Sequence, residues 1–213
     1  LMGMNERIAT TLVYAPDDFL EKEIAYGDLT YTQPIGSWGT KLEVSGAVTS
    51  TNPGFDLAQF KVNGQSVLLS AKVIQPIVRT RAFNWSVYGL FDWRNVNTQS
   101  NIDPTRHDRI AAFRLGTKLD RLDSFLGGGF NTLTIEAARG VDLFGASDKG
   151  DANMSRAAGN PQFTKIEAEV QRLQRLGNYF NLLIAAKGQM ANGAMLSSEE
   201  FGVGGSIYGR GYD

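Results

Sequence analysis

The sequence predicts an all-β fold, a transmembrane antiparallel up-and-down β-barrel, and three observations support this prediction. Apolar and polar residues alternate over long stretches, which is the period of a strand with two different faces. The connections between these stretches are alternately short and long. No run approaches the roughly 18 consecutive apolar residues that a transmembrane helix needs, so we expect any membrane crossing in this chain to be made by strands.

The alternation is clearest between Phe83 and Trp93, where Trp85 stands at an odd position and Asn84 and Asp92 at even ones. Nine runs of this kind follow one another, each with ends defined to within a few residues. They span residues 5–15, 22–33, 39–51, 62–75, 83–95, 107–119, 129–140, 162–176 and 178–191. Most exceed the usual strand of about 5–6 residues and reach the roughly 9–11 residues with which a tilted strand crosses a bilayer.

The connections differ in length and composition. The mostly short ones are 33–39, 76–81, 120–128 and 177–178. The longer ones, rich in Asn, Asp, Gly and Ser, are 52–60, 95–106 and 140–162. Short turns at one end and long polar loops at the other are typical of an outer-membrane barrel, with its turns in the periplasm and its loops outside the cell.

The two faces of the predicted strands suit lipid on one side and water on the other. In such a barrel the apolar face contacts lipid and the polar face lines the lumen. Charges of both signs occur at the polar positions, which favours a wet passage over a pocket for an apolar ligand. The lumen-facing candidates are Lys72, Asp92, Arg114, Glu136, Glu167, Glu169 and Lys187, together with Lys41, Glu43, Lys118 and Lys165. Arg139 and Arg172 fall on the apolar face near strand ends, where long side chains reach the membrane interface.

A soluble antiparallel sandwich is the alternative fold, since it also alternates between a packed and a wet face. Its strands are shorter, and its turn signals come about every 8–12 residues rather than roughly every 20 as in this chain. The spacing therefore favours the membrane barrel.

Composition excludes several classes of function. The net charge is −1 and the chain has no basic or acidic tract, so the charge distribution does not indicate a binding surface for nucleic acid. The absence of cysteine excludes disulfides and thiolate metal sites. The first residues show no signal-peptide pattern and the last ones stand within a loop signal, so we expect an internal fragment.

Few residues offer chemistry. His107 is the only histidine, which leaves no imidazole partner for a catalytic triad or a metal cluster. Asp148, Asp151 and Asn153 lack the spacing and the glutamate of a calcium loop. The glycines at 127–129 precede a strand, whereas a phosphate-binding loop opens a helix. We therefore expect no enzyme, no metal, no cofactor and no small-molecule substrate.

The last stretch, 196–213, surrounds Arg210 with glycine. Such a loop is by itself more often a turn than a site. It reads Ser198-Glu199-Glu200-Phe201-Gly202-Val203-Gly204-Gly205, followed by Tyr208-Gly209-Arg210-Gly211-Tyr212-Asp213. In this it resembles the outer-membrane transporters of two-partner secretion, the haemolysin-activator type, within the superfamily of barrel-assembly and protein-translocating barrels. In that family a phenylalanine and a glycine pair precede a hydrophobic-Arg-Gly-aromatic signature in a long extracellular loop.

The residues that match this signature loop are Phe201, Gly204, Gly205, Arg210, Gly211 and Tyr212, whereas Gly209 stands where a valine or isoleucine is usual. Weaker similarity runs through nearly the whole chain, for example at 26–31, 75–81 and 174–176. The resemblance implies that residues 1–195 supply about nine strands, the third to eleventh, of a sixteen-stranded barrel. It also implies that residues 196–213 form a loop folded into the lumen, and that the last strands and the periplasmic domains lie outside this chain.

The function implied by the resemblance is transport across the outer membrane of an unfolded, β-prone exoprotein, the expected partner besides the lipid bilayer. The resemblance also implies that Arg210 docks on an acidic motif in a later strand, because a guanidinium in a partly dehydrated lumen needs a carboxylate. Glu136, Glu167 and Glu169 are the acidic candidates within the chain. A passive porin, a barrel-assembly factor and a soluble β-rich binding module remain open as alternatives.

Overall fold

The structure, a computed structural model, describes residues 5–16, 22–52, 60–101 and 104–202. It is all-β, as the alternation predicts, and the nine predicted runs are nine strands. The strands are β1 (Arg7–Pro16), β2 (Lys22–Ile35), β3 (Thr40–Thr51), β4 (Asn63–Arg79), β5 (Phe83–Gln99), β6 (Arg106–Asp123), β7 (Gly129–Val141), β8 (Thr164–Leu176) and β9 (Phe180–Ala191). Two short 3-10 turns, η2 (Phe125–Gly127) and η3 (Ser197–Glu199), accompany them.

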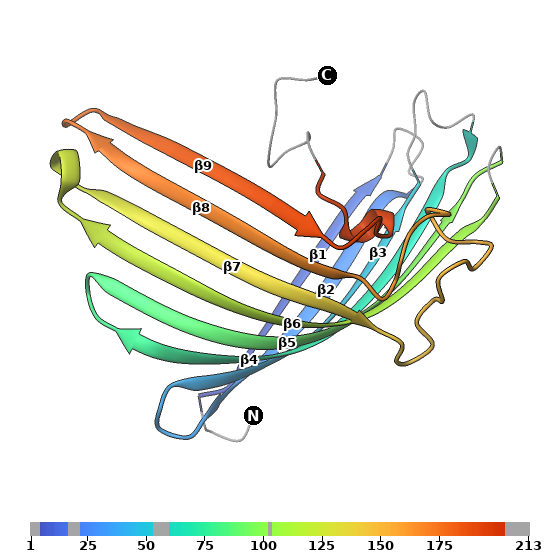
Figure 1. Ribbon diagram of the computed structural model, residues 1–213, viewed down its shortest axis with the longest axis horizontal. Helices are drawn as coiled ribbons and strands as arrows, with labels where there is room; N and C mark the ends of the chain where they lie inside the picture. The colour runs from blue at the N-terminus through green and yellow to red at the C-terminus, as the bar shows by residue number, and fades with distance from the viewer. Residues whose placement is uncertain (1–4, 17–21, 53–59, 102–103, 203–213) are drawn as a thin grey trace.

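Each strand pairs antiparallel with the next one in the sequence, so that one sheet holds all nine in the order β1 to β9. The sheet curls into a trough in which β9 lies across from β1 to β3 (Figure 1). Strand pairing between neighbours in the sequence and this curvature are features of an up-and-down barrel wall. Among the described residues, no helix is long and apolar enough to span a bilayer.

The central strands are longer than the alternation predicts. β4 continues through Pro76 to Arg79, with a register shift between Pro76 and Val78 that accommodates a residue without an N–H donor. β5 continues to Gln99 because residues 95–98, three of which are polar, pair with β6. The connection predicted at 95–106 is therefore only 100–105. Polar side chains at 95, 97 and 99, on the otherwise apolar face, hide this end of the strand from an alternation search, although the backbone still pairs.

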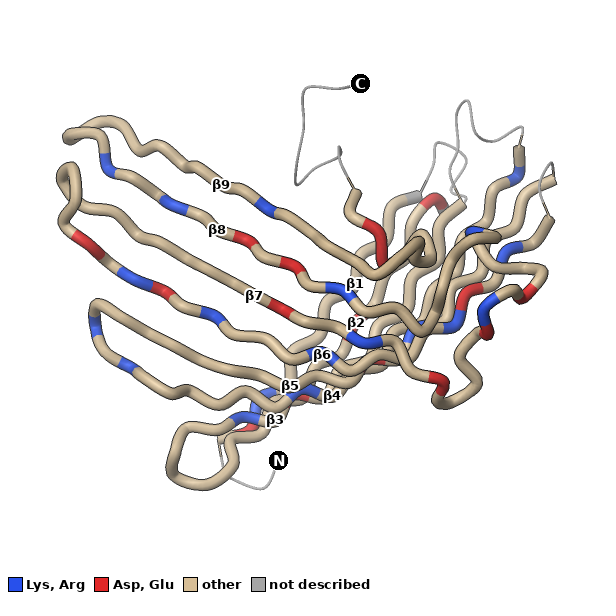
Figure 2. The backbone as a smooth tube through the Cα atoms, viewed as in Figure 1, with Lys and Arg blue, Asp and Glu red and all other residues tan. Residues whose placement is uncertain are grey.

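The strand register assigns each side chain to one of two faces. Pairs such as Glu43 with Lys72, and Glu136 with Glu167, place all eleven charged candidates on the same side of the sheet. This is the side on which the segment after β9 lies, and we call it the concave face (Figure 1). Figure 2 shows charges of both signs along β6 and β8.

The opposite, convex face is apolar and exposed. Leu69 and Leu115 are 52% and 68% exposed, although they lie in the middle of paired strands. A contiguous apolar surface of this kind on a sheet is the signature of a lipid-facing or partner-facing wall.

Arg172, one of the two arginines expected on the apolar face, is held by neighbours there. Its Nη1 lies 2.7 Å from Oδ2 of Asp123 and 2.6 Å from Oδ1 of Asn131, and its Nε lies 2.9 Å from Oε1 of Gln174. Arg139 donates to Thr164 Oγ1. Both sit at strand ends, Arg172 near the η2 turn and Arg139 near the opposite end.

Short turns lie at one end of the trough, at 36–39, 80–82, 124–128 and 177–179. At the other end the connection 142–163 is long, whereas only residues 100–105 separate β5 from β6. Gly36, Gly39 and Gly177 have positive φ values of 63°, 79° and 72°, which the tight turns require. The sequential antiparallel pairing of the nine strands confirms the up-and-down topology predicted from the sequence.

The only sizeable group of buried apolar side chains in the described residues lies inside the trough, at the end with the long loops. It joins Ile110 and Ala112 of β6 and Ala138 of β7 to Met154, Phe163, Met195 and Leu196. The connection 142–163, expected as an extended polar loop, thus packs Met154 onto the sheet and buries Ser147 to 8% exposure. Loop segments therefore cover part of the concave face and shape the site described next.

Candidate functional site

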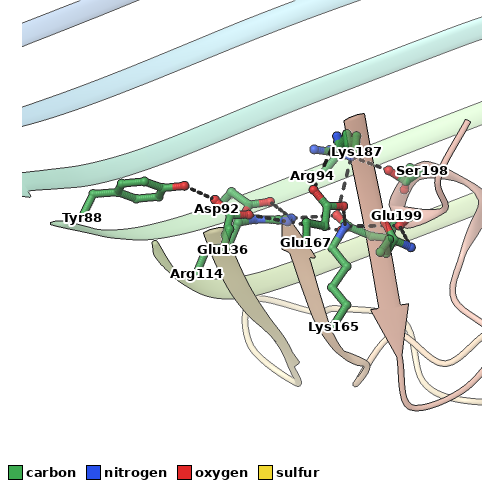
Figure 3. A network of polar contacts seen from close by, with 11 residues as sticks. Tyr88, Asp92, Arg94, Arg114, Glu136, Lys165, Glu167, Lys187, Ser198 and Glu199 are labelled. Carbon is green, nitrogen blue, oxygen red and sulfur yellow. Dashed lines mark hydrogen bonds and ion pairs between the residues drawn. The ribbon is translucent and has the colours of Figure 1, made fainter. Parts of the chain in front are cut away.

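The segment that follows β9 turns back into the trough and docks on its wall (Figure 3). Met195 and Leu196 belong to the small apolar core, and the η3 turn comes directly after them. Gly159 permits this close approach, because a Cβ there would lie only 2.7 Å from Cδ2 of Leu196. Apolar packing therefore delivers residues 197–199 to the charged part of the concave face.

Glu199 is the residue that this segment inserts. Its side chain is 2% exposed. Its Oε1 lies 2.7 Å from Nη2 of Arg114 and its Oε2 lies 2.7 Å from Nζ of Lys165, while Nη1 of Arg94 is 3.7 Å away. A buried carboxylate is tolerable only when it is paired and hydrogen-bonded, and these three cations supply both.

Arg114, at the centre of β6, holds two carboxylates at once. Its Nε and Nη2 donate to Asp92 of β5, the latter at 3.1 Å, and its Nη1 and Nη2 donate to Glu199 at 3.3 and 2.7 Å. The planar guanidinium presents its donors in a fixed fork that suits such two-sided pairing. Nη1 also lies 3.5 Å from Oε1 of Glu136.

The network extends along the wall on both sides of Arg114. Tyr88 donates to Oε2 of Glu136 at 2.8 Å. Glu167 lies 2.9 Å from Nζ of Lys165 and 3.6 Å from Nζ of Lys187. Five strands, β5 to β9, and the returning segment therefore meet in a cluster of matched charge, in which Asp92, Glu136, Glu167 and Glu199 face Arg94, Arg114, Lys165 and Lys187.

The ionisation of Glu199 follows from these contacts. Burial raises the pKa of its carboxyl, but the hydrogen bonds and positive charge of Arg114 and Lys165 outweigh burial, so the pKa lies below its ordinary value. Glu199 is therefore ionised at neutral pH. An ionised carboxylate between cations is an electrostatic anchor and offers no spare group for acid–base catalysis.

The cluster contains five of the lumen-facing candidates selected from the sequence, together with Lys165. They are Asp92, Arg114, Glu136, Glu167 and Lys187. Two other candidates, Lys72 and Glu169, lie outside these ion pairs. Nζ of Lys72 is 4.1 Å from the ring centre of Tyr88, and Oε1 of Glu169 accepts a hydrogen bond from the side-chain amide of Gln171. Lys41, Glu43 and Lys118 lie on the same face but line a separate cavity near the short turns.

Of the expected signature loop, only Phe201 lies within the described residues, where its ring centre is 5.8 Å from Nζ of Lys187. Gly204, Gly205, Arg210, Gly211 and Tyr212 lie outside them. Among the acidic candidates for Arg210, Glu136 and Glu167 already pair with cations of the wall.

Sequence reasoning missed Glu199, Arg94 and Tyr88 as members of the site. Arg94 and Tyr88 stand at even positions of the β5 alternation, so the period of two contained a signal for them. For Glu199 the signal was the acidic pair at 199–200 in a glycine-rich stretch. That pair cannot show which glutamate points inward, because the η3 turn decides it: Glu199 is buried and Glu200 is exposed.

His107 lies outside this cluster. Its Nε2 lies 2.7 Å from Oδ1 of Asn95 and 3.2 Å from Nε of Arg109, at the end of the sheet with the long loops. It thus has polar partners on the convex side of β5 and β6.

The fold of this chain is similar to that of a solved protein structure. The solved structure of CdiB from Escherichia coli matches with a TM-score of 0.70 at 18% sequence identity, over 89% of this chain and 35% of that one. At this identity the likeness shows the fold alone, and the chain spans about a third of that protein's length.

No curated protein sequence matches the chain. The model of the haemolysin secretion/activation protein family ShlB/FhaC/HecB matches residues 1–213. Because this match covers the chain from end to end, the protein belongs to the haemolysin secretion/activation family.

Proposed function

We propose that this chain forms part of an outer-membrane channel that secretes a partner exoprotein to the cell surface. The observation that carries the proposal is the returning segment after β9, whose Glu199 is buried in the charged cluster on the concave face. A wall segment that folds back and closes part of the lumen by ion pairs suits a channel that holds large cargo. Family membership, rather than this anchor, favours a protein cargo over small solutes.

The two faces support a wet passage inside a lipid-facing wall. The convex face exposes large apolar side chains such as Leu69 and Leu115, which lipid would cover. The concave face carries charges that cancel within the cluster. A balanced, hydrated wall offers an unfolded polypeptide neither a strong electrostatic trap nor an apolar surface on which to stick.

Family membership points in the same direction, because the family is described by secretion and activation of a haemolysin. In this proposal the chain forms and gates the passage through which the exoprotein moves. Its described residues bind and position the returning segment on the wall. The proposed location is the outer membrane, and the proposed partners are the lipid bilayer and a β-prone exoprotein.

The proposal is tested by deleting the gene for the full-length protein and restoring it. We expect a specific secreted protein to disappear from the cell surface and medium and to return on complementation. A passive porin would instead change the uptake of small solutes, and a barrel-assembly factor would lower the amounts of many outer-membrane proteins. Unchanged secretion together with either of those effects would contradict the proposal.

Arg210 provides a residue-level test, although it lies outside the described residues. We propose that its guanidinium docks on an acidic motif in a later strand of the full-length barrel, since Glu136 and Glu167 are already paired. Arg210→Ala then abolishes secretion while the barrel stays inserted, because strand ladders hold the barrel. Arg210→Lys restores secretion only in part, since an ammonium keeps the charge but lacks the two-pronged fork. Normal export by Arg210→Ala would exclude this role.

A further inference from the structure

A cavity of about 430 Å³ lies at the long-loop end of β6, apart from the charged cluster. It is lined by His107 and Arg109 of β6 and by residues of the connection 142–163. His107 and Arg109 stand at odd positions of β6, as Leu115 does, and therefore project from the convex face. The cavity thus opens on the side of the wall that we assign to lipid.

The cavity sits directly beyond an aromatic and apolar band. The rings of Phe91 and Phe113 are 5.0 Å apart, and Phe144 packs on Phe91 with ring centres 5.7 Å apart. Nε1 of Trp93 donates to the carbonyl oxygen of Phe144 at 3.3 Å, which ties the connection 142–163 to the convex face. Aromatic side chains gather at the level where lipid tails give way to headgroups. Arg109 precedes Phe113 by four residues on the same face of β6, about 13 Å nearer the long-loop end, where lipid headgroups would lie.

Arg109 is exposed and has donors to spare. Among the residues that the structure describes, its guanidinium donates only through Nε, toward His107. Gly145, with a φ of 70°, brings the loop backbone close to Nη1, since a Cβ at that position would lie 3.5 Å from this atom. The acidic lining residue, Asp151, accepts the N–H of Asp148 at 3.0 Å and is held by its own loop. The cavity therefore presents an arginine fork, which matches the geometry of a phosphate group.

We propose that this cavity binds the phosphate of a phosphorylated glycolipid headgroup in the outer leaflet, with Arg109 as the main ligand and His107 beside it. The proposal rests on the outer-membrane placement proposed above and is independent of the translocated cargo. Continuity with the apolar band selects a lipid as the occupant, because the acyl chains would lie against Phe113 and Leu115 while the headgroup enters the cavity. A free phosphate would gain nothing from that band.

The test uses the full-length protein in detergent and native mass spectrometry. We expect lipid A with two phosphates to bind, and Arg109→Gln to weaken this binding by roughly tenfold or more, as expected for the loss of charge-assisted hydrogen bonds. Lys149→Gln is the matched control: it removes one positive charge from the same connection at an exposed position that does not line the cavity. It should bind lipid A as the unmodified protein does. Both variants are first shown to be folded by their heat-dependent shift on gels.

Three outcomes would overturn the proposal. Equal losses in Arg109→Gln and Lys149→Gln would mean that only overall charge matters. Unchanged binding in Arg109→Gln would remove the arginine from the site. Displacement of lipid A by an equal concentration of inorganic phosphate would show a free-phosphate site instead. Arg109→Gln is expected to leave exoprotein export intact. Lipid binding therefore tests this site, and exoprotein export separately tests the proposed transport.

Discussion

Oε1 of Glu199 lies 2.7 Å from Nη2 of Arg114, although 85 residues separate them in the sequence. The same guanidinium binds Asp92, 22 residues away in the other direction. Arg114 therefore joins the returning segment to the wall.

Replacing Glu199 should release the segment without unfolding the sheet. In Glu199→Gln the neutral amide removes one counter-charge from Arg114 and one from Lys165, which keep Asp92 and Glu167 as partners. Breaking a buried pair costs about 3–5 kcal/mol, and these remaining partners place the expected cost at or below the lower end of that range. A fluorophore attached at an exposed Ser197→Cys should then report a mobile, solvated environment. The sheet should keep its strand signal in circular dichroism.

Glu200→Gln is the control for this variant, because it removes the same charge at the neighbouring residue. Glu200 pairs with Arg156 at the surface, with side chains 39% and 46% exposed, and such pairs contribute about 0–1 kcal/mol. If both variants changed the fluorophore equally, the anchor would not be specific to Glu199.

Docking of the segment should depend on pH only under acid conditions. The pKa of Glu199 is below its ordinary value of about 4.5 in the docked state, so docking favours the ionised form. The stabilisation is fully present above the ordinary value and declines as pH falls through the depressed one. The fluorophore at position 197 should therefore be constant from pH 8 to about pH 5 and change below about pH 4. The Glu199→Gln variant should lack this transition; a transition near neutral pH would point to another group.

Gly116 should be sensitive to a single methyl group. Tyr88 lies across it to reach Glu136, and a Cβ at Gly116 would come 2.2 Å from Cζ of Tyr88. Gly116→Ala must displace the ring and break its hydrogen bond, which we expect to cost about 1–3 kcal/mol in thermal or urea unfolding. Gly89→Ala in β5 is the control, since nothing lies within 4 Å of its added Cβ. Equal effects would show that strand propensity alone is being measured.

Neighbouring residues of β4 should respond oppositely to arginine. Leu69 is on the convex face and 52% exposed, whereas Ser70 is on the concave face, 2.7 Å from the hydroxyl of Ser45. Leu69→Arg should impair membrane insertion by about 2–4 kcal/mol near the bilayer centre, and Ser70→Arg should be tolerated in a wet lumen. The amounts of inserted protein in outer-membrane fractions measure this. The reverse order would mean that the lipid and lumen faces are exchanged.

The two ends of the trough should face opposite compartments. A cysteine at Lys149, exposed in the long connection, should react with a membrane-impermeant label on intact cells, while one at Ser37 in a short turn should not. The native chain has no cysteine, so the label has no background from these residues. Labelling at Ser37 alone would place the long loops in the periplasm and contradict secretion to the surface.

The sequence by itself determined the number of strands, their order of pairing and the faces of the eleven lumen-side candidates. These features follow from a period of two and from connection lengths, which are local properties that strand geometry imposes on any such chain. Even Arg139 and Arg172 were assigned to the convex face by counting alone. Strand ends were harder to predict, because the mostly polar residues 95–98 pair through backbone groups that carry no side-chain signal.

Only the tertiary structure decided which charges meet. Whether Glu199 or Glu200 turns inward depends on the η3 turn and on the apolar packing of Met195 and Leu196 before it. The double pairing of Arg114 depends on the returning segment, which places Glu199 between Arg114 of β6 and Lys165 of β8. Ion-pair partners separated by 85 residues are set by such long-range closure, because the attraction between charges acts only after the backbone has brought them within a few ångströms.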